Sequence, residues 1–588
     1  MYGSVAGAGE LLVTEINRST LITIIVVTLS IMHFVWGYAY LTMSGILDGE
    51  PKYISDECWY VSAARNMLRK MFGLEPNSCV NDLCYASVFV NDDVVKHRIE
   101  EYIINNNGVV VKDDYTHKVL AGYQYTIAFK APRYVIEELK RNYTVIVGYP
   151  YPDWDDVANY MNLEHPPLGK YFIALTMLIS DNPLAWKIPS LIAGSLIVIL
   201  SYLIVRRVLG EIPGLLAAGI VFIEPVIRAM SMVAMLDIYV ALFSVLSLYF
   251  AVKATYVLSS ATVGLAGSTK INGFTNALSI ILSGWRNRRI SNIKMIIYVF
   301  IIPLIIYTVV NIPVIIHEGG ITKWIDLQVW ALSWHTQSRP PGGPPIANPW
   351  DWFIARNPFP LHYHPDLSAT PSPPLMLLTI PLTIILAPLA LKGKIKGIGS
   401  ILAWFWIPIT MFTLLYAVGN RTQYSFYSAQ VTPIAALIVS SIVYLANRKN
   451  LVIEALKTYI LEESYRIVSL SIVGIISWII LAYIIPGLWG LIVSSIVLGV
   501  IVFYMSSKIV LRMILAGILG VIAPLSIYMY YYMIAGDATL SFLVKMAPYP
   551  LIPVVTSLTI TMVIAIALSL IKGKREEEEY IIRDRSPY

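Results

Sequence analysis

The sequence predicts an all-α polytopic membrane protein with a small α+β insertion in its first outer loop. Of its 588 residues, 57% are hydrophobic, and the mean hydropathy is +0.66. This composition is typical of membrane proteins and excludes an ordinary soluble domain. Apolar runs long enough to span a bilayer recur along the chain and predict about 12–14 transmembrane segments. The net charge of +6 comes largely from basic clusters beside these runs, which indicates topology and gives no reason to expect a nucleic-acid partner.

The apolar runs define the individual spans. We expect spans at 20–46, 185–205, 212–227, 237–256, 294–316, 375–391, 398–417, 429–446, 467–486, 488–505, 509–531 and 549–571, with a broken stretch at 257–284. Basic clusters such as Arg206-Arg207, 392–396 and 572–575 mark the cytoplasmic side. They place the N-terminus in the cytoplasm. Residues 168–181 are too short for a full span, so we expect them to be re-entrant or interfacial.

Five regions follow from this topology. They are 1–46, the N-terminus and first span; 47–165, an outer loop; 166–446, a transmembrane core with the outer loop 317–374; 447–571, a second bundle; and 572–588, a charged cytoplasmic tail. In the first outer loop, 57–73 has the pattern of an amphipathic surface helix. Short β-like runs and charged helical runs predict a compact α+β unit at 75–155. Its role stays open between shaping acceptor access and stabilising the loop.

The most specific motif is His165-Pro166-Pro167-Leu168-Gly169-Lys170, where the chain re-enters the membrane after the first outer loop. Two adjacent prolines hold the backbone rigid, so a histidine and a lysine are presented in a fixed geometry. With the preceding residues, 162–170 resembles the signature of the dolichyl-phosphate-mannose–protein mannosyltransferases, or protein O-mannosyltransferases. These are membrane enzymes of the GT-C superfamily. The lipid A 4-amino-arabinose transferases are more distant relatives. The resemblance covers roughly 15–440 without the insertion.

The resemblance implies an inverting glycosyltransferase that moves mannose from a dolichyl- or polyprenyl-phosphate donor to Ser/Thr hydroxyls of proteins. It implies an integral plasma-membrane enzyme with its active site on the extracytoplasmic face, no required cofactor, and an archaeal source. One alternative is a GT-C transferase acting on a lipid or glycan acceptor. Another is a transporter, which would show inverted repeats and polar residues at mid-membrane. The sequence leaves the sugar, the acceptor and a dimeric state open.

Two acidic residues follow the first span. Sugar transfer to a hydroxyl needs a base for the hydroxyl proton and a cation for the departing phosphate. Asp56 and Glu57 match the Asp-Glu pair that carries catalysis in the resembled family, with Asp56 as the base. An ordinary acidic pair in a solvated loop is the alternative.

Four further residues are candidates for an acceptor site or a second acid: Glu164, His165, Asp237 and His335. A salt bridge from Glu164 to Lys170 or Arg228 is the structural alternative for that residue. Asp237 resembles the Leu-Leu-Asp that begins a helix in the family, but it can equally cap the helix N-terminus. The family arginine five residues earlier is replaced here by Met232.

Four cations form the predicted donor-phosphate site: Lys170, Lys187, Lys270 and Arg421. An arginine can bind phosphate bidentately and a lysine as a point charge. Lys270 lies in an apolar stretch, 257–284, that has no acidic residue, so it needs an anion from elsewhere. A lipid phosphate, a snorkelling position and a distant acid such as Asp237 are the options.

Cysteines and possible metal ligands complete the sequence analysis. Cys79 and Cys84 form either a small disulfide in the outer loop or two free thiols. Asp153-Trp154-Asp155-Asp156 and His362-Tyr363-His364-Pro365-Asp366 could be metal ligands by spacing. We expect no metal, because the reaction needs only a base and fixed cations.

Overall fold

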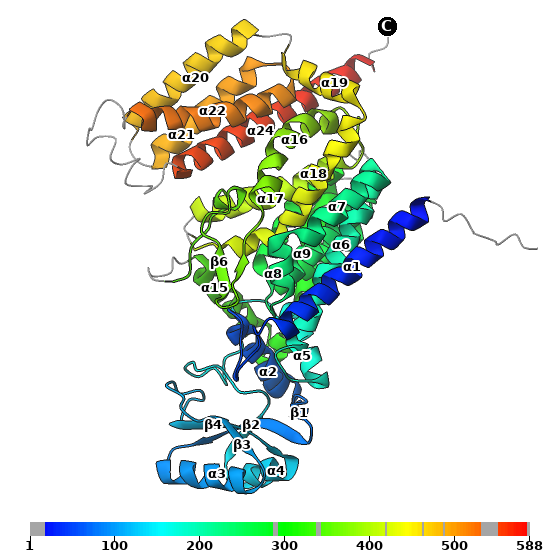
Figure 1. Ribbon diagram of the computed structural model, residues 1–588. Coiled ribbons are helices and arrows are strands. Elements are labelled where there is room, and N and C mark those ends of the chain that lie inside the picture. The colour runs from blue at the N-terminus through cyan, green and yellow to red at the C-terminus, as the bar shows by residue number, and fades with distance from the viewer. Residues whose placement is uncertain are drawn as a thin grey trace, which may run out of the picture.

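The computed structural model describes residues 18–285, 292–336, 343–417, 420, 422–460, 464–485, 488–530 and 551–584. Helices dominate it. The insertion lies at one end of the molecule, the helical core lies in the middle, and a second helical bundle lies at the other end (Figure 1). This confirms the predicted fold class of a mostly helical membrane protein with a small α+β unit.

Seven helical stretches among the described residues are long and apolar enough to cross a membrane, or up to nine if each bent pair is one span. They include α1 (Arg18–Met43), α6 (Ile188–Leu209), α16 (Pro373–Leu391), α17 (Ile398–Ala417), α21 (Leu488–Met505) and α24 (Leu551–Asp584). Shorter apolar helices occupy four other predicted segments, at Leu168–Ile179, Asp237–Val252, Ser469–Ala482 and Ile509–Pro524. The predicted total of about 12–14 spans therefore stays a prediction.

The core forms around α6, and one continuous cluster of buried apolar side chains joins its helices. Helices α7 (Glu211–Ile223) and α8 (Pro225–Ser231) meet at a bend of 59°. Helix α9 (Asp237–Val252) and helix α18 (Thr432–Ala446) pack beside them. Because α8 is short and bent, the chain returns into the membrane at Asp237 after only five residues of non-helical backbone.

The predicted break in 257–284 is present. Helix α10 (Tyr256–Thr269) ends before Lys270, a 3₁₀ turn η2 (Ile271–Thr275) follows, and α11 (Asn276–Trp285) continues. Glycines make this fold-back possible. A Cβ on Gly267 would lie 2.4 Å from the Phe274 ring, and one on Gly273 would lie 2.3 Å from the carbonyl carbon of Ala266. The small residues thus pack against their own turn.

The outer loop 317–374 and its flanks contain mostly short elements. They are α12 (Asn292–Ile296), η3 (Ile297–Ile301), α13 (Ile302–Val310), α14 (Ile312–His317), α15 (Ile321–Thr336), η4 (Asp351–Phe353), β6 (Phe359–His362), β7 (Leu367–Ala369) and η5 (Ser425–Gln430). Strands β6 and β7 pair antiparallel. Helix α15 places residues of the outer loop over the start of α5 (Leu168–Ile179), because the Trp334 ring contacts the His165 ring.

The C-terminal bundle has its own core. After α19 (Lys449–Ile460), helices α20 (Ser464–Ile484), α21, α22 (Ile509–Tyr530) and α24 pack around buried residues that include Trp478 and Leu498. Figure 1 shows these helices side by side beyond α16 and α17. The predicted boundary between the core and the second bundle, at 446–447, stays a prediction.

The insertion is the predicted α+β unit. Strands β2 (Leu83–Val90) and β4 (Tyr125–Pro132) form the centre of a five-stranded sheet with β1 (Cys79–Val80), β3 (Val109–Lys112) and β5 (Thr144–Val147). Alternate residues of β2 face opposite sides, as a strand requires. Val88 packs with helices α3 (Asp93–Asn105) and α4 (Arg133–Asn142), whereas Phe89 packs with Tyr151 on the other side. Cys79 and Cys84 form a disulfide between β1 and β2, which settles the alternative left open by the sequence.

Helix α2 (Glu57–Phe72) joins the first span to the insertion, and its environment corrects one expectation. The helix is present, but ten of its 16 residues are buried in the protein, so it is not the largely exposed amphipathic helix that the sequence predicted. Arg65 explains part of this burial. Its guanidinium donates to both carboxylate oxygens of Asp181 at 2.9 and 3.0 Å, and the Trp186 indole donates to the same carboxylate at 2.8 Å. These hydrogen bonds of Arg65 and Trp186 with Asp181 connect α2 to the turn between α5 and α6.

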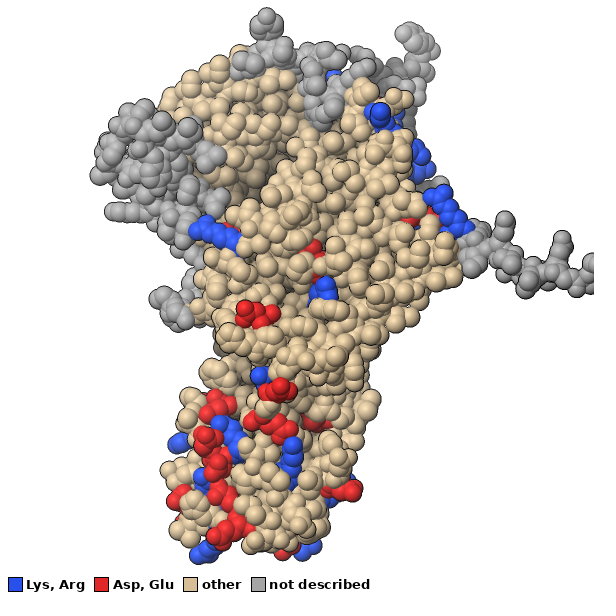
Figure 2. Space-filling model, viewed as in Figure 1, with Lys and Arg blue, Asp and Glu red and all other residues tan. Residues whose placement is uncertain are grey.

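Charged side chains are concentrated at the end of the molecule that carries the insertion. Figure 2 shows Lys, Arg, Asp and Glu crowded over the insertion, with a broad uncharged belt above it interrupted by few charges. Such a belt is the surface that a bilayer covers. The protein is therefore an integral membrane protein whose α+β insertion lies outside the apolar belt.

Candidate functional site

The His-Pro-Pro motif lies at the start of α5, and Pro167 precedes the first residue of that helix. Lys170 is fully buried, and its ammonium donates to the backbone carbonyls of Asn162, at a short distance, and of His165 at 2.8 Å. The lysine therefore holds the turn before its own helix. This position inside the protein favours a positioning role over the predicted contact with a phosphate.

Glu57 lies in the first turn of α2 and is fully buried. Its carboxylate accepts hydrogen bonds from the backbone N–H of Ile54 at 2.9 Å and of Ala234 at 2.7 Å, and from the Lys187 ammonium at 2.8 Å. All three donors therefore converge on one buried carboxylate. Glu57 and Lys187 thus connect the turn before α2 to the core, and this geometry favours positioning for both.

Asp56 immediately precedes Glu57 and differs from it in exposure. It occupies the position before α2 and is partly exposed, whereas Glu57, Glu164 and Asp237 are at most 5% exposed. Ser55 has a φ of 55°, so the backbone turns sharply just before the aspartate. The bonds of Glu57 fix this turn, and with it the place of the Asp56 carboxylate.

Lys270 follows the last turn of α10 and lies beside the first residue of α9. Its ammonium is 3.0 and 3.1 Å from the two carboxylate oxygens of Asp237. It also lies 4.2 Å from the ring centroid of Tyr427 and 5.1 Å from that of Phe426. The anion that the sequence required for Lys270 is therefore supplied by Asp237, the distant acid among the options, and not by a residue of its own stretch.

Tyr60 lies next to these groups, and no sequence pattern singled it out. The residue is 4% exposed, and its ring lies 5.8 Å from the His165 ring, which lies 6.0 Å from the Trp334 ring. Burial, followed by the charges of Asp56 and Asp237, raises the pKa of Tyr60 well above its usual value. Tyr60 therefore stays a neutral hydroxyl in the field of these two carboxylates.

Glu164 is buried beside the same group of rings. Its carboxylate accepts a short hydrogen bond from the Tyr160 hydroxyl and a second one from the Asn162 amide at 2.8 Å. The Asn162 amide also donates to the Tyr160 hydroxyl at 2.8 Å. These bonds order the segment that leads into the His-Pro-Pro motif. Tyr160 and Asn162 are site neighbours that the sequence did not single out by role.

Two predicted site residues cannot be placed. The backbone of His335 belongs to α15, but its side chain lies outside the described residues, and Arg421 lies outside them as a whole. The structure brings together Asp56, His165, Asp237 and Lys270 around Tyr60, directly or through electrostatic contact. It places Lys170 and Lys187 behind this group, inside the protein.

The two metal-like motifs have other roles in the described structure. Asp153 accepts hydrogen bonds from the backbone N–H of Thr116 at 2.9 Å and of His117 at 2.8 Å. His362 bonds the carbonyl of Pro365 at 3.0 Å through its Nδ1 atom. No group of three or more His, Cys, Asp or Glu side chains in the described part of the chain is placed to hold a metal ion.

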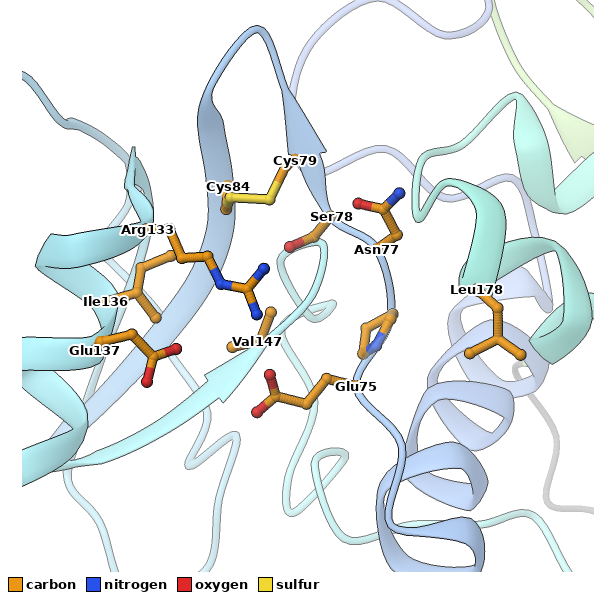
Figure 3. Close-up of a pocket in the computed structure, with 11 residues that line it drawn as sticks. Glu75, Asn77, Ser78, Cys79, Cys84, Arg133, Ile136, Glu137, Val147 and Leu178 are labelled. Carbon is orange, nitrogen blue, oxygen red and sulfur yellow. A yellow bond between two sulfur atoms is a disulfide. The ribbon is translucent and has the colours of Figure 1, made fainter.

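A pocket of about 350 Å³ lies apart from this group, between the insertion and α5 (Figure 3). Arg133 and Glu137 of α4 line one side, and Leu178 of α5 lines the other. The Lys140 ammonium is 2.9 Å from Glu75 and 3.2 Å from Glu137. None of the predicted site residues lines this pocket, so it is a separate feature of the insertion.

The comparisons with known proteins agree with the motif. The family model for dolichyl-phosphate-mannose-protein mannosyltransferase matches residues 164–317. This segment contains the whole His-Pro-Pro motif, Asp237 and Lys270, and it carries the sequence pattern of that family. The resemblance predicted from the motif is thereby confirmed. No curated protein matches the chain significantly.

Three solved structures show the range of similar folds. The apo oligosaccharyltransferase of Archaeoglobus fulgidus has 11% identity and a TM-score of 0.40, over 75% of this chain and 52% of that chain. ArnT from Cupriavidus metallidurans bound to undecaprenyl phosphate has 11% identity and a TM-score of 0.39, over 94% and 78%. AglB from Archaeoglobus fulgidus with an inhibitory peptide and a dolichol-phosphate has 12% identity and a TM-score of 0.39, over 73% and 51%. The chain thus spans about half the length of the archaeal enzyme.

Proposed function

We propose that the protein is an inverting membrane glycosyltransferase of the GT-C class. It transfers mannose from a polyprenyl-phosphate donor to Ser/Thr hydroxyls of proteins on the extracytoplasmic face. The family match over 164–317 supports the class of reaction. The observation that carries the assignment of the base is the exposure of Asp56, since the other three acidic candidates are at most 5% exposed.

The chemistry is a single displacement. The acceptor oxygen attacks C1 of mannose while Asp56 takes the hydroxyl proton, and the bond between C1 and the phosphate oxygen breaks. The polyprenyl phosphate leaves with that electron pair, and one displacement inverts the configuration at C1. The rings of Tyr60 and His165 lie 5.8 Å apart, and we assign them the positioning of the acceptor or the sugar. No cofactor takes part in these steps.

The departing phosphate needs a cation. Lys170, Lys187 and Lys270 are at most 4% exposed and are bonded to carbonyls, to Glu57 and to Asp237, so we assign them positioning roles. Arg421 remains the proposed phosphate ligand from the predicted set. It lies in the chain just before Tyr424 and Tyr427, and the Tyr427 ring contacts Lys270.

The outer face is proposed from charge. Helix α6 ends at Arg206 and Arg207, and the helices α16 and α18 run into 392–396 and Arg448-Lys449. Basic residues at these ends mark the cytoplasm, so the insertion and Asp56 lie on the opposite side and the N-terminus lies inside.

The test uses membranes that contain the full chain and labelled polyprenyl-phosphate mannose. Label should enter protein in a base-labile or protease-released Ser/Thr-linked form. Asp56→Asn should lower the rate about 10²–10⁴-fold, as loss of a general base does, while donor binding persists. Asp48→Asn, an exposed carboxylate in the same segment, is the matched control and should keep the wild-type rate.

The outcomes separate the alternatives. Transfer of label to a lipid or a glycan supports the acceptor alternative and overturns the protein acceptor. Absence of transfer from any polyprenyl-phosphate sugar contradicts the enzyme and favours the transporter. A wild-type rate in Asp56→Asn removes this residue from the mechanism.

A further inference from the structure

Arg228 is a cation at the rim of the transmembrane core that the proposed mechanism does not use. It lies in the last turn of α8 and is only partly exposed. Its guanidinium carbon lies 3.2 Å from the ring centroid of Trp36 on α1, so the planar group stacks on the indole. The contact joins two elements that are almost two hundred residues apart in sequence.

No described carboxylate neutralises this guanidinium. Within the described ranges, no acidic oxygen lies within ion-pair distance of Arg228. Glu224, one helical turn earlier, is 2% exposed and accepts hydrogen bonds from the backbone N–H and the hydroxyl of Ser372, both at 2.8 Å. The nearest acid along the helix is therefore engaged with another segment.

The topology proposed above puts Arg228 in the outer half of the membrane, where it is partly exposed. Trp36 is seven residues before Met43, the last residue of α1, and therefore lies about 10 Å below that end of the helix. Trp36 is 38% exposed, and its neighbour Val35 is 56% exposed. Aromatic rings at this depth are typical of the membrane–water boundary.

The energetics require an anion at this place. A charged side chain in the bilayer is costly unless it is paired or reaches the headgroups. At the boundary of the hydrocarbon region, the available anion is the phosphate of a lipid. A guanidinium can donate two parallel hydrogen bonds to such a phosphate.

We propose that Arg228 and Trp36 form a binding site for a lipid phosphate between α1 and α8 on the outer leaflet. The occupant is a phospholipid headgroup or a polyprenyl phosphate, which share this chemistry. The site is independent of the proposed transfer reaction, because neither residue belongs to the group around Asp56 and Tyr60.

The experiment uses the delipidated full chain in a neutral detergent and measures the rise in Tm as lipid is added. Phosphatidylglycerol, undecaprenyl phosphate and a neutral diacylglycerol are titrated separately. The wild type should be stabilised by one or both phosphate lipids and not by diacylglycerol. Arg228→Met should bind them about tenfold more weakly, as the loss of a charge-assisted hydrogen bond predicts. Arg228→Lys should retain part of the effect.

Control variants distinguish weaker lipid binding from loss of folding. Arg133→Met removes one positive charge from the outer insertion and should leave the lipid titration unchanged. If Arg228→Met does not fold, Trp36→Leu and Arg228→Lys are compared by native mass spectrometry for bound lipid. Stabilisation by undecaprenyl phosphate alone identifies the carrier as occupant, and stabilisation by both identifies a general lipid-phosphate site. Equal titrations for wild type and Arg228→Met, or equal retained lipid in all variants, overturn the proposal.

Discussion

The ammonium of Lys270 lies 3.0 and 3.1 Å from the two carboxylate oxygens of Asp237, which is 33 residues earlier in the chain. Both side chains are nearly inaccessible, at 5% and 3% exposure. The pair joins the start of α9 to the end of α10, beside the rings of Phe426 and Tyr427. It explains how a lysine is tolerated in an otherwise apolar stretch without an acid of its own.

The first prediction tests this pair by a double-mutant cycle. Lys270→Met and Asp237→Asn should each destabilise the protein by about 3–5 kcal/mol, because each leaves a buried charge without its partner. The double variant should recover most of that loss, since no buried charge remains. Thermal or denaturant unfolding in detergent measures all four proteins.

Lys253→Met is the matched control, since Lys253 is an exposed lysine at the opposite end of α9. Its unfolding should resemble that of the wild type. If Lys270→Met folds normally but raises the KM for the lipid donor, the structural role is wrong and the lysine binds phosphate.

Features that depend on neighbouring residues were predictable from the sequence, whereas most contacts between residues far apart in the chain were not. The sequence predicted the short α5, the break after α10 and the sheet of the insertion, because each follows from local patterns of apolar, small and proline residues. The resemblance to a known family also identified Asp56, His165 and Asp237 as candidate site residues.

Apart from Asp237, which the sequence offered as one possible partner of Lys270, the partners of the charged residues were not predicted. Lys187 was expected to bind phosphate but is paired with Glu57, 130 residues away, and Lys170 bonds carbonyls of its own preceding turn. Tyr60 was not singled out, because a tyrosine in an amphipathic pattern gives no sign of the rings that surround it. Ion pairs between distant elements follow from tertiary packing, which composition and spacing do not encode.

The second prediction concerns the hydrogen bonds that the Glu57 carboxylate accepts next to Asp56, which we call the Glu57 tether. Glu57→Gln should lower both transfer activity and stability, because an amide cannot accept from Ile54, Ala234 and Lys187 as a carboxylate does. Lys187→Met should have the same direction of effect, and the double variant should be less destabilised than the sum of the two. Transfer rates and unfolding midpoints are measured on the same preparations.

Glu50→Gln serves as the control for this tether, because Glu50 is a carboxylate of the same segment paired with Lys130 at 3.0 Å but partly exposed. It should change stability by less than about 1 kcal/mol. A normal rate and normal stability for Glu57→Gln would show that the tether does not position Asp56.

The third prediction uses the cysteines. Burial, with the nearby carboxylates of Asp56 and Glu57, raises the pKa of the Cys58 thiol. A raised pKa keeps the thiol protonated at neutral pH, so iodoacetamide should label Cys58 of the folded protein only slowly at pH 8. Cys79 and Cys84 should be labelled only after reduction. Mass spectrometry of the peptides reads all three sites.

Denatured protein is the reference for this labelling, and there Cys58 should react at the rate of an ordinary thiol. Rapid labelling of Cys58 in the folded protein would show that α2 is not packed as described. Labelling of Cys79 without reductant would show that the bridge is absent.

The last prediction concerns metal ions. A carboxylate base and fixed cations suffice for the proposed transfer, so EDTA should leave the rate unchanged. Asp153 would be the leading ligand of a metal at the insertion, but its carboxylate already accepts from Thr116 and His117. Although its partial burial opposes the charge, these hydrogen bonds lower the pKa of Asp153. Asp153→Asn should therefore loosen the loop, seen as faster proteolysis of the insertion, with no change in the response to metal. A metal site at 153–156 would instead be established by two results together. EDTA would stop transfer until manganese or magnesium is added, and in Asp153→Asn the added metal would no longer restore transfer.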